Sequence, residues 1–255
     1  MPLEIVTIPC LSDNYAFLIR DEVTGTVACV DAPEAGPIIA EAEERGWSID
    51  TLLITHHHPD HIDGIPELVA QFDCKVVGAA ADAHRIPGLD VKVAEGDSVA
   101  VGAETADILN VSGHTVGHIA FHFAGAKAVF SADSLMALGC GRLFEGDPAM
   151  MWGSMQKFLA MPHDTVVCSG HEYSASNAKF AVTIEPDNAA LAARVDEIEA
   201  TRAAGEFTVP SMLGLEKATN PFLRAHLPET KAAIGLEGVA DAEVFGEIRA
   251  RKDRF

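Results

Sequence analysis

Hydrophobic residues in the first half of the chain occur in short runs, separated by turn residues and by stretches with helical spacing. LEIVTIP, YAFLIRD and TVACVDA alternate or are continuously apolar, as β-strands are. Residues 34–46 show helical spacing, with Pro37 in the predicted first turn and Gly46 at the predicted end. TLLIT, at residues 51–55, predicts a buried strand, and residues 63–72 predict the helix that follows it.

Strand-like runs continue in the middle of the chain as ADILNVS, IAFHFAG and AVFSAD, and the pattern changes only in the last third. After Tyr173, apolar residues fall at spacings of three and four, above all in residues 188–205, where Asp187 is the predicted N-cap. We therefore expect the α/β class, with a first domain over residues 1–172 and a helical C-terminal domain over residues 173–255.

Charge and cysteine content narrow the classes of function. The 18 lysine and arginine residues stand against 38 aspartate and glutamate residues, so the formal net charge is −20. Such a surface repels nucleic acids and anionic membranes. The five cysteines are scattered and never spaced C-x-x-C, which fits reduced thiols in a cytoplasm. We expect a cytoplasmic monomer that binds neither nucleic acid nor membrane.

The most informative segment follows the predicted strand at 51–55. His56, His58, Asp60 and His61 form the pattern H-x-H-x-D-H. Imidazole nitrogen and carboxylate oxygen are ligands for zinc, iron or manganese. Alternate residues of an extended segment point the same way, so His56 and His58 can bind one ion while Asp60 and His61 face a second. His57 lies between two ligands and should point the opposite way.

One loop cannot fill two coordination spheres, and further ligand residues stand at the ends of other predicted strands. These are His114, Asp133 and His171, each preceded by an apolar run and a small residue. A carboxylate such as Asp133 can bridge two ions. Cys168 is interpreted as a small buried strand residue. Asp31 is either an acceptor for a ligand imidazole or a cap or turn residue. The residues alone thus predict a dinuclear metal hydrolase.

The order of these ligands resembles the metallo-β-lactamase superfamily over about two thirds of the chain. A more specific resemblance, to hydroxyacylglutathione hydrolase (glyoxalase II), extends over nearly the whole chain. It rests on THHHPDHIDG, SGHTVGH, SADSLMALGCGRLFEG, GHEY, TNPFLR and the final RARKDRF. The resemblance implies a four-layer αββα sandwich with a helical C-terminal domain. It also implies hydrolysis of S-D-lactoylglutathione to glutathione and D-lactate, the second step of methylglyoxal detoxification by the glyoxalase route.

The resemblance also implies a role for each ligand position. His56, His58 and His114 match the ligands of a first divalent metal ion, and Asp60, His61 and His171 match those of a second. Asp133 matches the bridging carboxylate. From the chemistry, we also expect Asp60 to orient the nucleophile. Zinc is the expected metal, although this ligand set also accepts iron or manganese. Two cations that share a hydroxide lower its pKa and provide a nucleophile at neutral pH.

Glutathione carries two carboxylates, and its binding site needs cations. The family pattern assigns substrate contacts to five positions, which here are Arg142, Phe144, Tyr173, Arg249 and Lys252. Many members have lysine and tyrosine where this chain has Arg142 and Phe144. The arginine keeps the charge, whereas the phenylalanine loses a hydroxyl and with it one hydrogen bond to the tripeptide.

Other interpretations of the same residues remain open. The basic residues near the C-terminus could instead complement the dipole of a final helix, an interpretation that we favour for Arg251 and Arg254. The nearest alternative function is a glutathione persulfide dioxygenase with a single iron, followed by another hydrolase of the metallo-β-lactamase fold. A protein that binds two metals without catalysis is a third.

Overall fold

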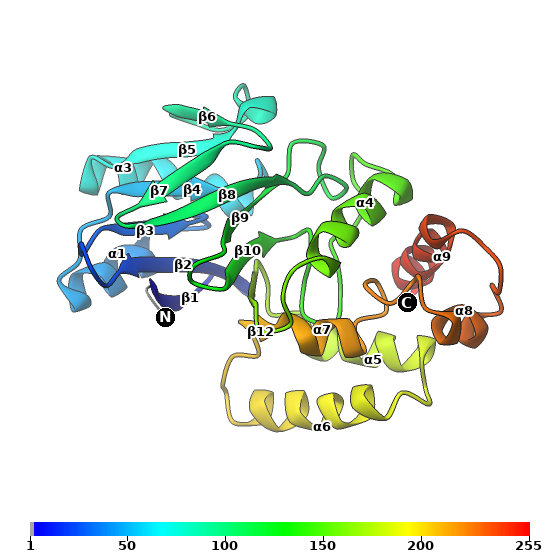
Figure 1. Ribbon diagram of the computed structural model, residues 1–255. Helices are drawn as coiled ribbons and strands as arrows, with labels where there is room; N and C mark the ends of the chain where they lie inside the picture. The colour runs from blue at the N-terminus through cyan, green and yellow to red at the C-terminus, as the bar shows by residue number, and fades with distance from the viewer. Residues whose placement is uncertain (1–2) are drawn as a thin grey trace. The chain divides into compact units, whose positions relative to one another are not determined.

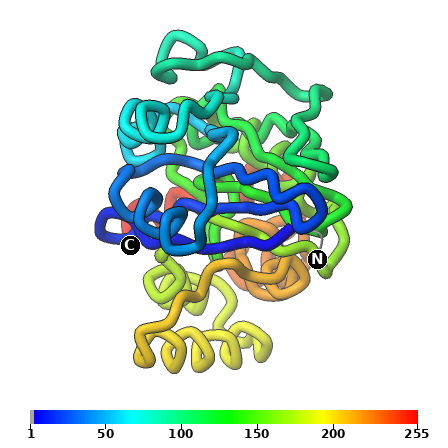
Figure 2. The backbone as a smooth tube through the Cα atoms, turned by 90° about the vertical axis from the view of Figure 1, so that its left-hand side faces the viewer, coloured from blue at the N-terminus to red at the C-terminus, as the bar shows by residue number. Residues whose placement is uncertain are grey.

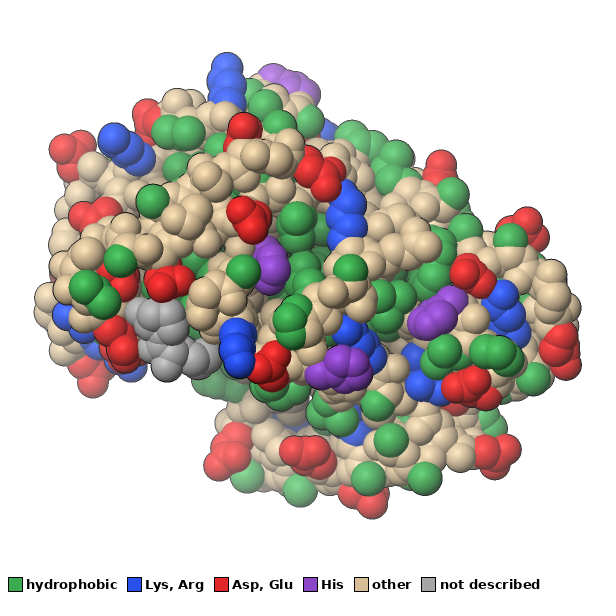
Figure 3. Space-filling view, in the orientation of Figure 1, with side chains coloured by type: hydrophobic (Ala, Val, Ile, Leu, Met, Phe, Trp, Pro, Cys, Tyr) green, Lys and Arg blue, Asp and Glu red, His purple; other side chains and the backbone are tan. Residues whose placement is uncertain are grey.

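The computed structural model describes residues 3–255, which fold as two compact units. The first unit comprises Met1–Asn110 and Gly117–Ala132, and the second comprises Val111–Val116 and Asp133–Phe255. Among the described residues, no helix combines the length and the apolar composition that a membrane crossing requires. On the face drawn in Figure 3, acidic side chains are widely spread, as the net charge of −20 leads one to expect.

The first unit contains a six-stranded sheet (Figure 1). Its strands follow chain order: β1 (Leu3–Cys10), β2 (Asn14–Asp21), β3 (Val27–Val30), β4 (Thr51–Ile54), β5 (Lys75–Ala79) and β6 (Val91–Val93). The first three strands pair antiparallel, and β3 to β6 pair parallel. Helical segments connect the parallel strands: α1 (Ala35–Arg45), α2 (Pro59–Ile62), α3 (Ile65–Phe72) and the 3₁₀ turn η1 (Ala80–Asp82). Because parallel neighbours end at the same edge, the loops after them meet there.

Successive side chains of a strand point to opposite faces of the sheet, so the apolar side chains of the first unit form one buried layer on each face. Leu18 and Leu52 belong to a buried cluster that also contains Ile38 of α1. On the opposite side of β2, Phe17 makes an edge contact with Phe130, with ring centroids 5.6 Å apart. Phe130 lies in a second group of antiparallel strands: β7 (Ser98–Val101), β8 (Glu104–Asn110), β9 (Ile119–Phe123) and β10 (Ala128–Ala132). The two sheets therefore pack face to face, with α1 on the outer side of the first.

The second unit is mainly helical. Its elements are α4 (Pro148–Leu159), β11 (Val166–Ser169), α5 (Ser174–Ile184), α6 (Ala189–Ala203), β12 (Ser211–Met212), α7 (Leu213–Thr219), α8 (Pro228–Ile234) and α9 (Asp241–Arg254). Helices α5 and α6 lie side by side, as Figures 1 and 2 both show. Leu138, Ala178 and Leu191 belong to the apolar cluster between these helices and the loop after β10.

The structure confirms the α/β class and the helical C-terminal region. One detail of the sequence interpretation is wrong. Asp187 does not cap the helix α6; the side chain of Asn188 accepts a hydrogen bond from the backbone N–H of Leu191 instead. Asp and Asn are equally good N-caps, so propensity could not decide between two adjacent residues.

Candidate metal centre

The loop after β4 carries four of the predicted ligands. His56 and His61 are fully buried, and His58 is partly buried. Nε2 of His56 lies 3.2 Å from Nδ1 of His58. Two ligands of a tetrahedral zinc ion, each about 2.05 Å from it, are separated by about 3.3 Å. The two nitrogens therefore have the spacing of a pair that binds one metal ion.

Asp31, at the end of β3, determines which nitrogens of two of these histidines carry a proton. Its carboxylate accepts hydrogen bonds from Nδ1 of His61 at 2.8 Å and from the Thr55 hydroxyl at 2.8 Å. Because the Thr55 proton points at Asp31, the hydroxyl oxygen accepts from Nδ1 of His56, 3.0 Å away. Both imidazoles thus keep the Nε2 lone pair that a metal requires. Of the two interpretations of Asp31, the structure supports the acceptor of a ligand imidazole.

We expect Asp31→Ala to lower metal affinity by about 10–100-fold, since His56 and His61 both lose the group that orients them. Competition with a metal chelator measures this. Asp21→Ala is the matched control, because Asp21 is also buried in the first unit and holds a turn through Thr24 and the N–H of Ala103. An equal loss of metal in both variants would show that general destabilisation is the cause.

Asp60 is held by a residue to which the sequence assigned no role. Nδ2 of Asn14 donates to the backbone oxygen of Asp60 at 2.9 Å and to its Oδ2 at 3.0 Å. The same Oδ2 lies 3.8 Å from Nε2 of His61. Asn14 is buried at the start of β2, whereas the Asp60 side chain is 40% exposed. Asn14 therefore holds Oδ2 of Asp60 on the side that faces Nε2 of His61.

The second unit carries the other three predicted ligands, grouped around one carboxylate. Nε2 of His114 lies 3.3 Å from Oδ2 of Asp133, and Nε2 of His171 lies 3.3 Å from its Oδ1. These separations exceed those of charge-assisted hydrogen bonds, about 2.7–2.9 Å, and match the spacing of ligands on a shared ion. Nδ1 of His114 donates to the backbone oxygen of Arg142 at 2.8 Å, which leaves Nε2 as the acceptor. The donor set of each unit thus fits divalent metal ions.

Close packing around this group explains the Gly-Cys-Gly sequence that follows it. A Cβ atom on Gly141 would lie 2.2 Å from the backbone oxygen of Asp133 and 2.7 Å from Nδ1 of His114. Both approaches are far inside van der Waals contact, so only glycine fits. The glycine lets the chain pass directly beside two predicted ligands.

Two of the predicted substrate contacts are strongly exposed. The Arg142 side chain is 63% exposed and Phe144 is 61% exposed. The Arg142 guanidinium lies 5.8 Å from the centre of the Phe144 ring, and that ring meets His114 edge-on at 5.3 Å. Tyr173 stacks on His171, with ring centroids 4.7 Å apart. Two aromatic rings thus border the predicted metal ligands of the second unit.

The other two predicted contacts lie on α9. Arg249 is buried; its Nη1 donates to the backbone oxygen of Cys140 at 3.0 Å, and its Nη2 lies 2.9 Å from Oδ1 of Asp253. The same Oδ1 lies 3.9 Å from Nε of Arg142. Asp253, which the sequence did not single out, therefore links the cation on α9 to the cation on the Arg142 loop.

Lys252 is partly buried, with its ammonium 5.2 Å from the centre of the Phe180 ring. Burial, together with the charge of Arg249, lowers the pKa of Lys252. By contrast, Arg251 and Arg254 both face Glu247, at 2.9 and 3.9 Å. Both thus take part in surface ion pairs on α9, and their role in complementing the dipole of this helix stays a prediction.

Cys168 is fully buried in β11, and burial raises the pKa of its thiol far above the ordinary value. This supports the interpretation of Cys168 as a small apolar residue of the strand.

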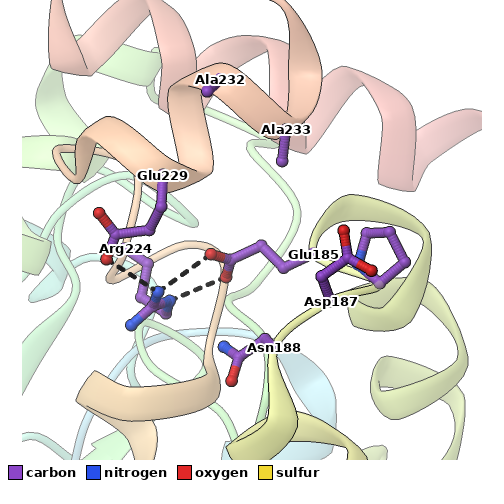
Figure 4. A pocket seen from close by; sticks show the side chains of 8 residues that line it. Glu185, Asp187, Asn188, Arg224, Glu229, Ala232 and Ala233 are labelled. Carbon is purple, nitrogen blue, oxygen red and sulfur yellow. Dashed lines mark hydrogen bonds and ion pairs between the residues drawn. The ribbon is translucent and has the colours of Figure 1, made fainter.

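A cleft of about 570 Å³ in the second unit contains none of the predicted site residues (Figure 4). It is lined in part by Glu185, Arg224 and Glu229. The guanidinium of Arg224 pairs with both oxygens of Glu185, at 2.8 and 3.0 Å, and Thr230 donates to the same carboxylate at 2.8 Å. These polar groups satisfy one another and connect the end of α5 to α8.

Comparison with known proteins gives concordant results over the whole length. The model of the metallo-β-lactamase superfamily matches residues 13–171, and that of the hydroxyacylglutathione hydrolase C-terminus matches residues 172–255. A protein from Ruegeria pomeroyi named hydroxyacylglutathione hydrolase is 60% identical over 255 residues, with all of both chains covered. One of the same name from a Jannaschia species is 60% identical over 252 residues, 99% of this chain and 98% of that one.

Solved structures agree at the level of the fold. The ETHE1 protein of Myxococcus xanthus superposes with a TM-score of 0.68 at 23% identity, covering 98% of this chain and 90% of that one. A metallo-β-lactamase of Staphylococcus aureus gives a TM-score of 0.67 at 20% identity, covering 97% and 70%. These neighbours confirm the predicted metallo-β-lactamase fold.

Proposed function

Because the chain belongs to the hydroxyacylglutathione hydrolase family, we propose that it hydrolyses S-(2-hydroxyacyl)glutathione thioesters, with S-D-lactoylglutathione as substrate and glutathione and D-lactate as products. The protein is a metal-dependent hydrolase of the metallo-β-lactamase fold. The observation that carries the proposal is full-length identity of 60% to relatives of that name. The match includes the C-terminal region, where the predicted glutathione contacts Arg249 and Lys252 lie.

We propose that the metal centre contains two divalent ions, with zinc as the metal. One set of ligands would be His56, His58 and His114, the other would be Asp60, His61 and His171, and Asp133 would serve both. Imidazole and carboxylate donors suit zinc. In support, Asp31 and Thr55 leave Nε2 of two of these histidines as an acceptor, and the ligand separations of 3.2 and 3.3 Å are those of atoms that share an ion.

Two divalent ions would supply a hydroxide nucleophile at neutral pH and a Lewis acid for the thioester carbonyl. The side chains of the protein then have three tasks. Asp31 fixes the tautomers of the ligand imidazoles, Asn14 directs Asp60, and Asp133 aligns His114 with His171. The leaving thiol has an ordinary pKa near 8.5, so it departs as thiolate without a general acid. No serine or cysteine nucleophile is required.

We further propose that cations of the second unit bind the two glutathione carboxylates. Arg142 is exposed and its planar guanidinium suits a carboxylate. Lys252 adds a charge beside Arg249, while Asp253 holds Arg249 and approaches Arg142. Tyr173 and Phe144 offer ring faces to the tripeptide. Phe144 has no hydroxyl, so it contributes packing without a hydrogen bond.

We expect Lys252→Ala to raise KM about tenfold and to leave kcat nearly unchanged, because a charge-assisted hydrogen bond of about 1.5 kcal/mol to an unreacting part of the substrate is lost. Steady-state kinetics with S-D-lactoylglutathione measure it. Arg251→Ala, one residue earlier on α9, is the control and should keep the wild-type KM. A fall in kcat at unchanged KM would assign Lys252 to the chemistry instead.

The glutathione persulfide dioxygenase is not favoured. That alternative uses a single iron and has a reduced helical tail, whereas residues 172–255 match the hydrolase C-terminus. The division into a catalytic domain over residues 1–172 and a substrate-binding domain over residues 173–255 remains our proposal. A monomeric state also remains a proposal. So does a cytoplasmic location, which the five buried free thiols support.

The proposal is tested by the loss of thioester absorbance when metal-loaded protein meets S-D-lactoylglutathione, with oxygen uptake in the presence of glutathione persulfide measured in parallel. We expect rapid hydrolysis and no oxygen uptake. Oxygen uptake without hydrolysis would establish the alternative, and inactivity in both assays would reject both enzymes.

A further inference from the structure

His57 stands between two predicted metal ligands and makes contacts of its own with Asp82 and Arg85. Nδ1 of His57 lies 3.1 Å from Oδ2 of Asp82, and Nε2 of His57 lies 3.0 Å from Nη1 of Arg85. Arg85 closes the ring through Nε, 3.1 Å from Oδ1 of Asp82, and through Nη2, which contacts the same oxygen. These three side chains, the His57 triad, connect the loop after β4 to the η1 turn after β5.

Hydrogen-bond chemistry allows the His57 triad only one arrangement of protons. A guanidinium has donors and no acceptor, so Nε2 of His57 must accept from Arg85. The proton of the neutral ring is then on Nδ1 and is donated to Asp82. Both ring nitrogens are used, and the plane of the imidazole is fixed at two points. The middle histidine of the loop therefore has one orientation.

Asp82 is well placed to act as an anchor, because it is fully buried and cannot move without moving its neighbours. A Cβ atom on Gly117 would lie 2.3 Å from a carboxylate oxygen of Asp82. The backbone at Gly117 thus closes one side of the carboxylate, while Arg85 and His57 occupy its oxygens. The next residue, His118, stacks on His56 with ring centroids 4.5 Å apart.

Fixing His57 also fixes the residues on either side of it. In an extended segment, neighbouring side chains point to opposite faces, so an anchored His57 sends His56 and His58 to the other face together. The 3.2 Å between their ligand nitrogens depends on the backbone angles at His57. A change in these angles would therefore alter the spacing of the two ligand nitrogens.

We infer that Asp82 and Arg85 are positioning residues for the metal centre: through His57 they hold the loop in the conformation in which His56 and His58 bind the same ion. This inference rests on the proposed function, because it presumes that His56 and His58 are metal ligands. It assigns a task to an acidic and a basic residue that lie 25 and 28 positions from His57 in the sequence.

Zinc release from the metal-loaded protein to a chromogenic chelator tests the inference. Arg85→Gln is the main variant, since the Arg85 side chain is 27% exposed and its loss is tolerable for folding. Arg45→Gln is the matched control: Arg45 is 33% exposed, pairs with Glu41 in the same unit and touches no residue of the loop. Asp82→Asn, which removes the charge with little change of shape, is the second variant.

We expect Arg85→Gln and Asp82→Asn to release zinc at least about tenfold faster than wild type, as is usual when the group that orients a ligand is removed. Arg45→Gln should release it at the wild-type rate. The melting temperatures of the metal-free Arg85→Gln and Arg45→Gln proteins should be alike, which a purely structural role of Arg85 would not produce. Imidazole ¹⁵N spectra of wild type, assigned with a His57→Gln variant, should show the Nδ1–H tautomer.

Equal zinc release from all three variants, or an Nε2–H tautomer of His57, would overturn the inference while leaving the proposed function in place. A wild-type protein that takes up no metal would overturn both. The two failures are therefore distinguishable.

Discussion

Asp133→Asn is expected to reduce kcat/KM for S-D-lactoylglutathione by at least about 10³-fold, more than the loss of a single oxyanion donor costs. The side chain keeps its size, but the amide nitrogen that replaces one oxygen has no lone pair with which to bind a cation. Both oxygens are in use, since His114 and His171 each lie 3.3 Å from one of them. Metal content should fall along with activity.

Asp196→Asn, an exposed position on α6, makes the same chemical change away from the ligands and should retain both activity and metal. Kinetics and metal analysis on the two variants decide the point. An Asp133→Asn protein that kept two metals and more than about a tenth of wild-type kcat/KM would show that the carboxylate does not join the two groups of ligands.

Arg194→Ala is expected to destabilise the protein by about 3–5 kcal/mol, because it leaves a buried carboxylate without its counter-charge. Arg194 contacts Glu216 through Nη2 and donates to Thr219 through Nη1 at 2.7 Å. Glu216 is fully buried and also accepts from the N–H of Leu138 at 2.9 Å and from Ser211 at 2.7 Å. Denaturant unfolding measures the change.

Arg202→Ala on the same helix is the control. Its partner Glu172 lies 3.3 Å away, and the Arg202 side chain is 37% exposed, so the expected cost is about 1 kcal/mol or less. Similar losses for the two arginines would contradict the account of Glu216 as a buried charge that depends on Arg194. Because Leu138 follows Asp133 by five residues, loss of Arg194 should also loosen the predicted metal ligands of the second unit.

Local patterns were sufficient for much of the fold and for the choice of candidate ligands. The strands β1 to β4 follow directly from runs such as YAFLIRD and TLLIT, because alternation and length distinguish a strand from a helix. His56, His58 and His61 stand within six residues, so their common purpose is visible in the sequence. The metallo-β-lactamase fold was implied by the family resemblance that these ligands carry, and solved structures confirm it.

Apart from Asp31, the residues that contact the predicted ligands could not be predicted in the same way. Asn14 lies 46 positions from Asp60, and His57 lies 25 positions from Asp82, so each contact exists only after the strands are assembled. Asp253 looks like one more charge on a C-terminal helix until its oxygen is seen between Arg249 and Arg142. Asparagine, aspartate and arginine are common on surfaces, and a single sequence does not distinguish such residues from solvated ones.

The most direct test is a titration of metal-free protein with zinc, in which the initial rate of S-D-lactoylglutathione hydrolysis is measured against zinc bound per chain. A dinuclear centre built from the seven ligands predicts that activity rises to a maximum as the second equivalent of zinc is bound. Full activity at one equivalent, or no hydrolysis at two, would contradict it.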